Sequence, residues 1–129
     1  MYFGNPTAER AAIEATYEDT ATISRVEPVT GDDKITKRIP VPVYTDVICA
    51  LSYTGGDKSQ QTKAKNNIEY DAVVFVAPEL VILPGDSISL RRFGHDNPKS
   101  PIALNFHVVG RPPVYATHQE VKVKDGDLA

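Results

Sequence analysis

The chain has 129 residues, of which 41% are hydrophobic and 24% are charged, and its formal net charge is −3. This length and composition predict one globular domain and exclude a wholly disordered chain. No apolar run approaches the roughly 18 residues of a membrane helix, and the polar start resembles neither a signal nor a transit peptide, so we expect synthesis in the cytoplasm and no membrane partner. The negative net charge argues against a dedicated nucleic-acid binder.

The first segment predicts a short helix over residues 5–15. Asn5 is a suitable cap, Pro6 suits the first helical position, and the alanines that follow favour a helix. Ile13 is the one large apolar residue of this segment, so its packing face is thin. We therefore expect an N-terminal helical arm at 1–16, followed by a single β-barrel domain at 17–129.

From Tyr17 onward the pattern is typical of β-strands, and the clearest strand covers residues 39–51. The residues of one parity are apolar and are predicted to be buried. They are Ile39, Val41, Val43, Val47, Cys49 and Leu51. Pro40 and Pro42 lie on the other parity, and because proline cannot donate to a sheet ladder, this half is expected at a sheet edge or in an extended arm.

Further strands are predicted over 68–77, 81–90, 102–108 and 117–124. The run at 81–90 is expected to turn at Pro84 and Gly85. Proline presets φ for the second position of a type II turn, and glycine accepts a positive φ at the third. About six strands and no long helix predict a mostly β fold. A small antiparallel β barrel and a β sandwich both satisfy this pattern.

A long polar connection over residues 53–67 has no large aliphatic residue and carries three lysines against one acid. Long loops of this kind are commonly functional, and ordering this one would release little hydrophobic free energy. We expect it to be mobile in the isolated protein and ordered against neighbours. Its candidate contacts to a partner or a channel are Lys58, Gln61, Lys63 and Lys65.

Residues that carry catalysis or bind metals form no recognisable pattern. Cys49, the single cysteine, lies in an apolar strand and is predicted to be a small buried hydrophobe. His95, His107 and His118 lack the spacing of a metal site. A nucleophile elbow and a phosphate-binding loop are also missing. We therefore expect a protein that is not an enzyme and needs neither a cofactor nor a metal.

A single-stranded nucleic-acid binding β barrel is the alternative function. Phe93 and Tyr115 are candidates for stacking on bases. The basic residues near predicted loops are Lys63, Lys65, Arg91, Arg92, Lys99 and Arg111. Binding of this kind weakens steeply with salt, because contacts to phosphates release counterions.

The C-terminal strand resembles the ending of a known protein family. Residues 115–121 are similar to the Tyr-x-Ser-His-Gln-Glu-hydrophobic ending of small minor capsid proteins of tailed phages and prophages, which are head–tail connector proteins of the head-closure, or stopper, type. The matching residues are Tyr115, His118, Gln119 and Glu120. Gly85 and Asp86 match the Ile-x-x-Gly-Asp-x-Ile segment of that family, and residues 47–52 and 73–76 follow its order.

The resemblance covers residues 17–124 and departs from the family pattern at 94–101 and at Pro112 and Pro113. It implies an antiparallel β barrel that sits in a ring below the portal adaptor, helps to retain packaged DNA and offers a docking surface to the tail. The expected partners are the portal/adaptor and tail proteins of the same phage, with non-specific contact to packaged DNA. A monomer is expected in isolation and a homo-oligomeric ring at the head–tail interface of the virion, after assembly in the host cytoplasm.

Overall fold

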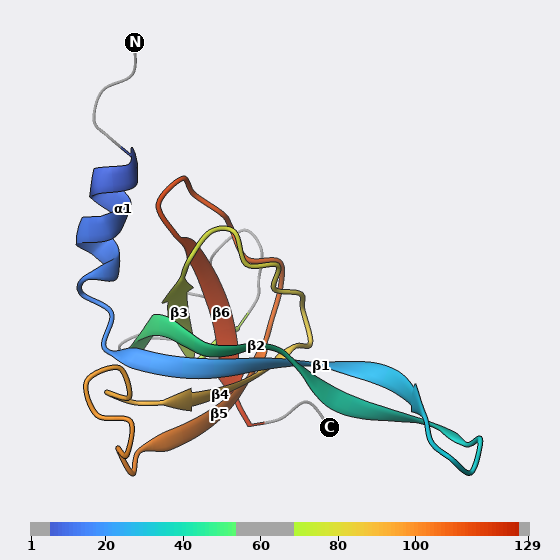
Figure 1. Ribbon diagram of the computed structural model, residues 1–129. Helices are drawn as coiled ribbons and strands as arrows, with labels where there is room; N and C mark the ends of the chain where they lie inside the picture. Colours follow the sequence, from blue (N-terminus) through green and yellow to red (C-terminus); the bar gives the residue numbers. More distant parts are fainter. Residues whose placement is uncertain (1–5, 54–68, 127–129) are drawn as a thin grey trace.

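The structure is a computed structural model that describes residues 6–53 and 69–126. Over these ranges it consists of one short helix and six strands (Figure 1). The elements are α1 (Pro6–Glu14), β1 (Asp19–Thr30), β2 (Thr36–Tyr53), β3 (Ala72–Val76), β4 (Ser87–Arg91), β5 (Ala103–Val108) and β6 (Gln119–Asp125). The mostly β fold with a short N-terminal helix that the sequence predicts is confirmed.

The strands close into a barrel in the order β1, β2, β3, β6, β5 and β4. Every neighbouring pair is antiparallel. One end of the barrel therefore carries the last residues of β1, β3 and β5 and the first residues of β2, β4 and β6. We call this the arm end. Because the sheet is closed, the fold is a barrel and not a sandwich.

Inward side chains of all six strands fill the barrel, as the period of two in each predicted strand requires. In β3 and β6, buried and half-buried residues alternate. The residues with no exposed surface include Ile23, Val74, Val76, Phe106, Val121 and Val123. Removing such side chains from water contributes about 25 cal/mol per Å² of apolar surface, which makes this core the main source of stability.

The parity predicted for β2 is correct at its end and wrong at its start. Cys49 and Leu51 are buried, whereas Ile39 is 41% exposed and Val41 and Val43 are only half-buried. The reason is that β2 bends at two register shifts, one on each side of Ile23, and its first residues then lie outside the barrel (Figure 1).

At these shifts β2 contains more residues than the facing part of β1. Ala21 pairs with Val47 and Ile23 pairs with Tyr44, so three steps on β2 face two on β1. Asp46 lies within this bulge with a φ of 52°. A bulge bends its strand and changes which side chains face inward, which is why Tyr44 packs against the core.

Beyond the bulge, β1 and β2 leave the barrel as a two-stranded ribbon, which we call the arm (residues 25–41). Figure 1 shows it projecting sideways from the barrel, far beyond the other connections. Its turn is closed by a hydrogen bond from the Lys34 N–H to the Gly31 carbonyl at 3.0 Å, with Lys34 in the left-handed region at φ 62°. The extended arm that Pro40 and Pro42 predict is present.

Three prolines occupy equivalent positions on the β1–β2 ladder, two in the arm and one at its base. Pro28, Pro40 and Pro42 pair with Arg38, Val26 and Ser24, every second position of the ladder. The Gly31 N–H bonds the Ile35 carbonyl, so the prolines fall in the pairs whose backbone groups point outward. The N–H groups that they lack would have lined the free edges of the arm.

Helix α1 spans residues 6–14 of the predicted 5–15 and lies beside the barrel. Arg10 pairs with Glu14 at 2.9 Å and with Glu79 of the β3–β4 connection. Tyr17 is buried where the chain enters the barrel, and among the described residues its hydroxyl has no hydrogen-bond partner. The structure contains no helix in its described ranges that is long and apolar enough to cross a membrane.

Candidate functional site

The connection between β3 and β4, residues 77–86, crosses the arm end of the barrel. The predicted strand at 81–83 is wrong, because these residues are irregular. The predicted turn is correct: the Asp86 N–H bonds the Leu83 carbonyl at 3.1 Å, and Gly85 has a φ of 91°. Ile82 points into the core at 5% exposure, which anchors the middle of the connection.

Asp86 fixes this connection to the base of the arm. Its carboxylate is buried and accepts two hydrogen bonds from the Arg25 guanidinium, at 2.9 and 2.8 Å. It also accepts the Leu83 N–H at 2.9 Å. The same guanidinium donates to the Val81 carbonyl at 2.9 Å, while the Val81 N–H donates to the Tyr44 hydroxyl at 2.9 Å. Both polar backbone groups of Val81 are thereby satisfied.

Gln119 fixes the first part of the same connection. Its side chain is 1% exposed, and its amide donates to the carbonyls of Ala77 at 2.9 Å and Leu80 at 2.7 Å. Asp86 and Gln119 lie 33 positions apart in the sequence, yet both bond residues 77–83. The two segments that carry the family resemblance therefore meet at one loop.

Tyr115, His118 and Glu120 shape the neighbouring turn before β6. The rings of Tyr115 and His118 stack with centroids 5.1 Å apart, and the His118 Nε2 lies 3.0 Å from the Glu120 carboxylate. The Tyr115 N–H also bonds the His118 carbonyl at 2.7 Å. These contacts are local, so the three residues shape the turn at the arm end.

A surface pocket of about 320 Å³ opens between these two loops, and we call it the loop pocket. Its lining includes Glu79, Val81, Leu83, Arg111, Pro112 and Val114. Val81 and Val114 are 57% and 58% exposed. The buried polar bonds of Asp86 and Gln119 thus support a loop that presents apolar side chains to solvent.

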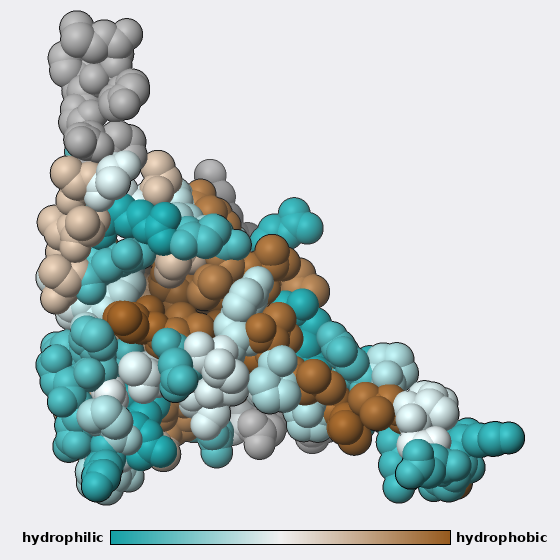
Figure 2. Space-filling model, in the orientation of Figure 1, coloured by the Kyte–Doolittle hydropathy of each residue, from teal (hydrophilic) through white to brown (hydrophobic). Residues whose placement is uncertain are grey.

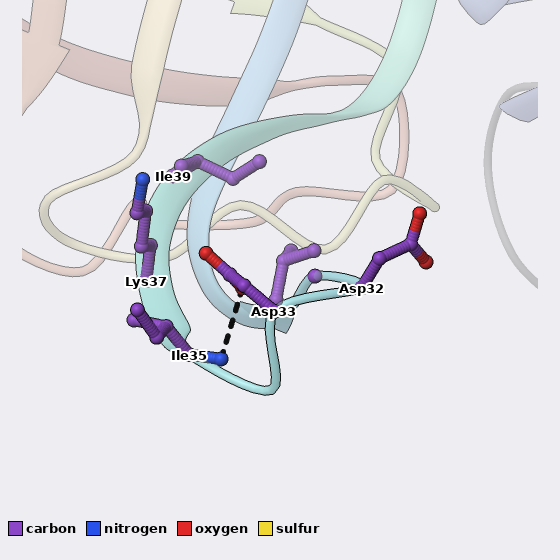
Figure 3. Close-up of a pocket in the computed structure, with 7 residues that line it drawn as sticks. Asp32, Asp33, Ile35, Lys37 and Ile39 are labelled. Atoms are coloured by element: carbon purple, nitrogen blue, oxygen red, sulfur yellow. Dashed lines mark hydrogen bonds between the residues drawn. The ribbon is translucent and has the colours of Figure 1, made fainter.

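The arm carries a second apolar surface. On one face, Val29, Ile35, Lys37 and Ile39 surround a shallow pocket of about 410 Å³ near the turn. Figure 3 shows Ile35, just before β2, and Lys37 and Ile39 in β2 following one another along the chain, with Asp32 extending away from them. Asp33 is used locally, because its carboxylate accepts the Ile35 N–H at 3.0 Å.

The opposite end of the barrel is fixed by Asp19. This carboxylate is 1% exposed and accepts the backbone N–H groups of Leu51 at 2.8 Å and Phe93 at 2.7 Å. Arg92 donates to it at 3.1 Å and to the Leu51 carbonyl at 2.8 Å. Asp19 and Arg92 therefore join β1, β2 and the β4–β5 connection.

The two aromatic residues considered for base stacking do not form one surface. Phe93 follows the end of β4 and Tyr115 precedes the start of β6, and these strands run parallel across β5, so the residues lie at opposite ends of the barrel. Arg92 is engaged by Asp19, and its guanidinium lies 5.0 Å from the centroid of the Phe93 ring. Phe93 and Tyr115 are thus not brought together into one stacking surface.

Cys49 is buried, as predicted, and burial raises the pKa of its thiol to about 12. In the described ranges, no three side chains of His, Cys, Asp or Glu are grouped so that they could hold a metal ion. Lys58, Gln61, Lys63 and Lys65 of the polar connection lie outside the described residues.

Sequence reasoning did not find Arg25, Tyr44, Asp19 or Arg92 as structural residues. Arg25 and Tyr44 lie in strand patterns where a polar residue is ordinarily solvated, and their partners are 61 and 37 positions away. The periodicity of a strand carries no signal of such long-range bonds.

No family model matches the chain, and no curated protein gives a significant sequence match. Among solved structures, protein SF1141 of Shigella flexneri 2a is similar with a TM-score of 0.63 and 12% identity, over 85% of this chain and 93% of that chain. This similarity shows a shared fold. Protein XkdH of the phage-like element PBSX of Bacillus subtilis has a TM-score of 0.42 and 12% identity, over 84% of this chain and 92% of that chain.

Proposed function

We propose that this chain is a structural protein of a tailed-phage or prophage virion, a head–tail connector of the head-closure type. The observation that carries the proposal joins sequence and geometry. Asp86 and Gln119, which belong to the two resembling segments, both bond the loop at 77–83. That loop presents Val81 and Leu83 to solvent. Buried residues that maintain an exposed apolar surface suit a protein whose work is binding other proteins.

The arm supports the same proposal. A two-stranded ribbon with exposed aliphatic side chains on both faces contributes little to the core of the monomer. Val26 and Ile39 are both more than 40% exposed. Such a ribbon gains stability when a partner covers it, as expected for a subunit of a larger assembly.

In the proposed assembly, a ring of subunits joins the portal/adaptor to the tail and helps to retain packaged DNA. The lysines of the polar connection, Lys58, Lys63 and Lys65, are proposed to face the DNA, because they exceed the one acid of that segment, Asp57. The proposal assigns the protein no catalytic step and no cofactor.

The decisive experiment is co-expression of the full chain with the portal and adaptor proteins encoded beside it. The expected result is a ring on the portal assembly in electron micrographs. Particles made after deletion of the gene should lack this ring. Gene-deleted particles should package DNA, lose it and remain without tails. Failure of the chain to associate with any head-side protein would contradict the proposal.

A second experiment tests the DNA contact separately. Lys58→Ala, Lys63→Ala and Lys65→Ala, combined in one chain, should leave ring assembly intact and reduce the fraction of heads that keep their DNA. Lys124→Ala is the control, because that half-buried lysine lies on β6. Equal DNA retention in the triple variant and the control would remove the DNA contact from the proposal.

A further inference from the structure

We propose that the arm of one molecule docks in the loop pocket of a second copy of the chain, in a head-to-tail contact. This inference deepens the proposed function, since it names the two surfaces through which neighbouring subunits of the ring meet. It rests on the shape, polarity and charge of the described arm and pocket.

The arm has an apolar face that its own chain leaves uncovered. Val29, Ile35 and Ile39 are 40%, 55% and 41% exposed. They share the face of the ribbon that continues inward to the buried Ile23, so the pattern of a core strand extends beyond the core. Figure 2 shows apolar surface running along the arm from the barrel until the hydrophilic tip. Such a face is stabilised when a partner excludes water from it.

The extended arm does not reach its own loop pocket. Arg25, at the base of the arm, bonds the Val81 carbonyl beside that pocket. Gly31, at the turn just after β1, is six residues further along the chain than Arg25, which corresponds to about 20 Å at about 3.3 Å per residue. The tip of the arm is therefore available to the pocket of another molecule and not to its own.

The loop pocket offers a complementary surface. Val81, Leu83 and Val114 expose aliphatic side chains around a volume of about 320 Å³. Hydrogen bonds from Arg25 and the buried Gln119 to backbone carbonyls, and from the Val81 N–H to the Tyr44 hydroxyl, hold its walls in place. A preformed apolar pocket loses little conformational entropy when aliphatic side chains enter it.

The charges of the two surfaces are also complementary. Asp32 lies at the tip of the arm and Arg111 lies at the loop pocket, and within the described ranges neither has an ion pair in the monomer. The arm also carries Lys37, while the pocket carries Glu79, which pairs with Arg10 in the monomer. Opposite charges at the rim of an apolar contact orient the two molecules and exclude other registers.

The contact uses the side chains of the arm and not its edges. Pro28 and Pro40 remove outward N–H groups from the two edges of the ribbon, so addition of another strand lacks donors there. The exposed aliphatic face is therefore the surface that remains for recognition.

A head-to-tail contact closes into a ring when its rotation permits, and otherwise forms a filament. One arm in one pocket is a small contact, which is weak between two free molecules. In a ring every subunit makes the contact twice, so it becomes stable once a portal-side protein gathers the subunits.

Cross-linking tests the contact in the full-length protein. Ile35→Cys and Val114→Cys are made in separate chains, mixed, and treated with a short bismaleimide; Cys49 is buried and does not compete. We expect a covalent heterodimer from the mixture and little product from either variant alone. Ile102→Cys, an exposed aliphatic position at the opposite end of the barrel, replaces Val114→Cys as the control and should give little product.

Charge reversal distinguishes docking from random collision. Asp32→Arg in the arm partner, or Arg111→Glu in the pocket partner, should each lower the cross-linked yield several-fold. Combining the two should restore it, because the reversed charges attract again. Both positions are exposed, so both variants are expected to fold.

Three outcomes would overturn the inference. They are equal cross-linking to Val114→Cys and Ile102→Cys, no cross-linking at all, and a yield that neither charge reversal changes. Cross-linking of Ile35→Cys to a portal-side or tail protein in place of Val114→Cys would overturn it as well. Each of these outcomes leaves the virion role standing if the protein still joins the portal assembly, so the two proposals fail separately.

Discussion

The Arg25 guanidinium donates two parallel hydrogen bonds to the Asp86 carboxylate, from Nε at 2.9 Å and from Nη2 at 2.8 Å. Asp86 is 2% exposed, while the Arg25 side chain keeps 25% of its surface in solvent. The pair links the first residue of the arm to the connection between β3 and β4. The geometry of the loop pocket therefore depends on the position of the arm.

Removing one partner of this pair should be strongly destabilising. Asp86→Ala leaves the Leu83 N–H without its acceptor and the Arg25 guanidinium with the Val81 carbonyl alone, and loss of one partner of a buried pair costs about 3–5 kcal/mol. Urea denaturation measures this loss as a lower free energy of unfolding. Asp32→Ala, at the exposed turn of the arm, is the matched control and should change it by no more than about 0.5 kcal/mol.

Replacing Gln119 should loosen the loop at 77–83 without emptying the core. Gln119→Leu keeps much of the side-chain volume but leaves the Ala77 and Leu80 carbonyls without a donor, at a cost of about 1–3 kcal/mol. Limited proteolysis should then cut within 77–83 earlier than in the parent protein. Glu120→Gln, on the outer face of the same strand, should show the parent rate. Equal rates in the two variants would mean that Gln119 does not hold the loop.

Two aliphatic residues of β2 should differ sharply in how much their replacement by alanine lowers the free energy of unfolding. Leu51→Ala empties part of the barrel core and should lower the free energy of unfolding by about 2–5 kcal/mol. Ile39→Ala removes a side chain that is 41% exposed on the arm, and its effect should stay within about 0.5 kcal/mol. Lys122→Ala and Lys124→Ala, on the outward face of β6, should also change the free energy of unfolding by no more than about 0.5 kcal/mol. Similar losses for Leu51→Ala and Ile39→Ala in chemical denaturation would show that the arm is part of the cooperative core.

Cys49 should make the protein less stable in alkali. Burial raises the pKa of this thiol from 9.0 to about 12. Above pH 9 the unfolded chain loses the proton while the folded chain keeps it, so the free energy of unfolding should fall as the pH rises from 9 towards 12. Urea midpoints across this range measure the slope.

Cys49→Ala should show a shallower alkaline slope, whatever its stability at neutral pH. Burial also raises the pKa of Tyr17, so part of the slope should remain in this variant and disappear when Tyr17→Phe is added. An unchanged slope in Cys49→Ala would show that the thiol ionises equally in both states.

Much of the fold could be predicted from local patterns. Ile88 and Leu90 in β4, and Val121 and Val123 in β6, alternate with polar residues and are buried as expected. The turn at Gly85 was also predictable, because proline and glycine restrict the backbone locally.

The start of β2 could not be predicted in the same way. Its apolar alternation is continuous in the sequence, but the strand bends at the irregular stretch around Asp46, and the residues before this bend lie outside the barrel. Alternation reports that one face is apolar, and it does not report whether the partner covering that face belongs to the same chain. The buried bonds of Asp86 and Gln119 depend on distant residues, which no local pattern encodes.

The spacing of Pro28, Pro40 and Pro42 has a consequence for the protein before assembly. A ribbon with exposed Val26, Val29 and Ile39 would ordinarily invite cross-β aggregation, because its edges offer rows of unpaired backbone groups. Here three of the outward-facing positions carry a proline and therefore lack a donor. The chain is thus expected to remain soluble at high concentration while the apolar side chains of its arm stay exposed. Restoring the donors with alanine at all three prolines should leave the barrel folded and make the free protein prone to fibril formation.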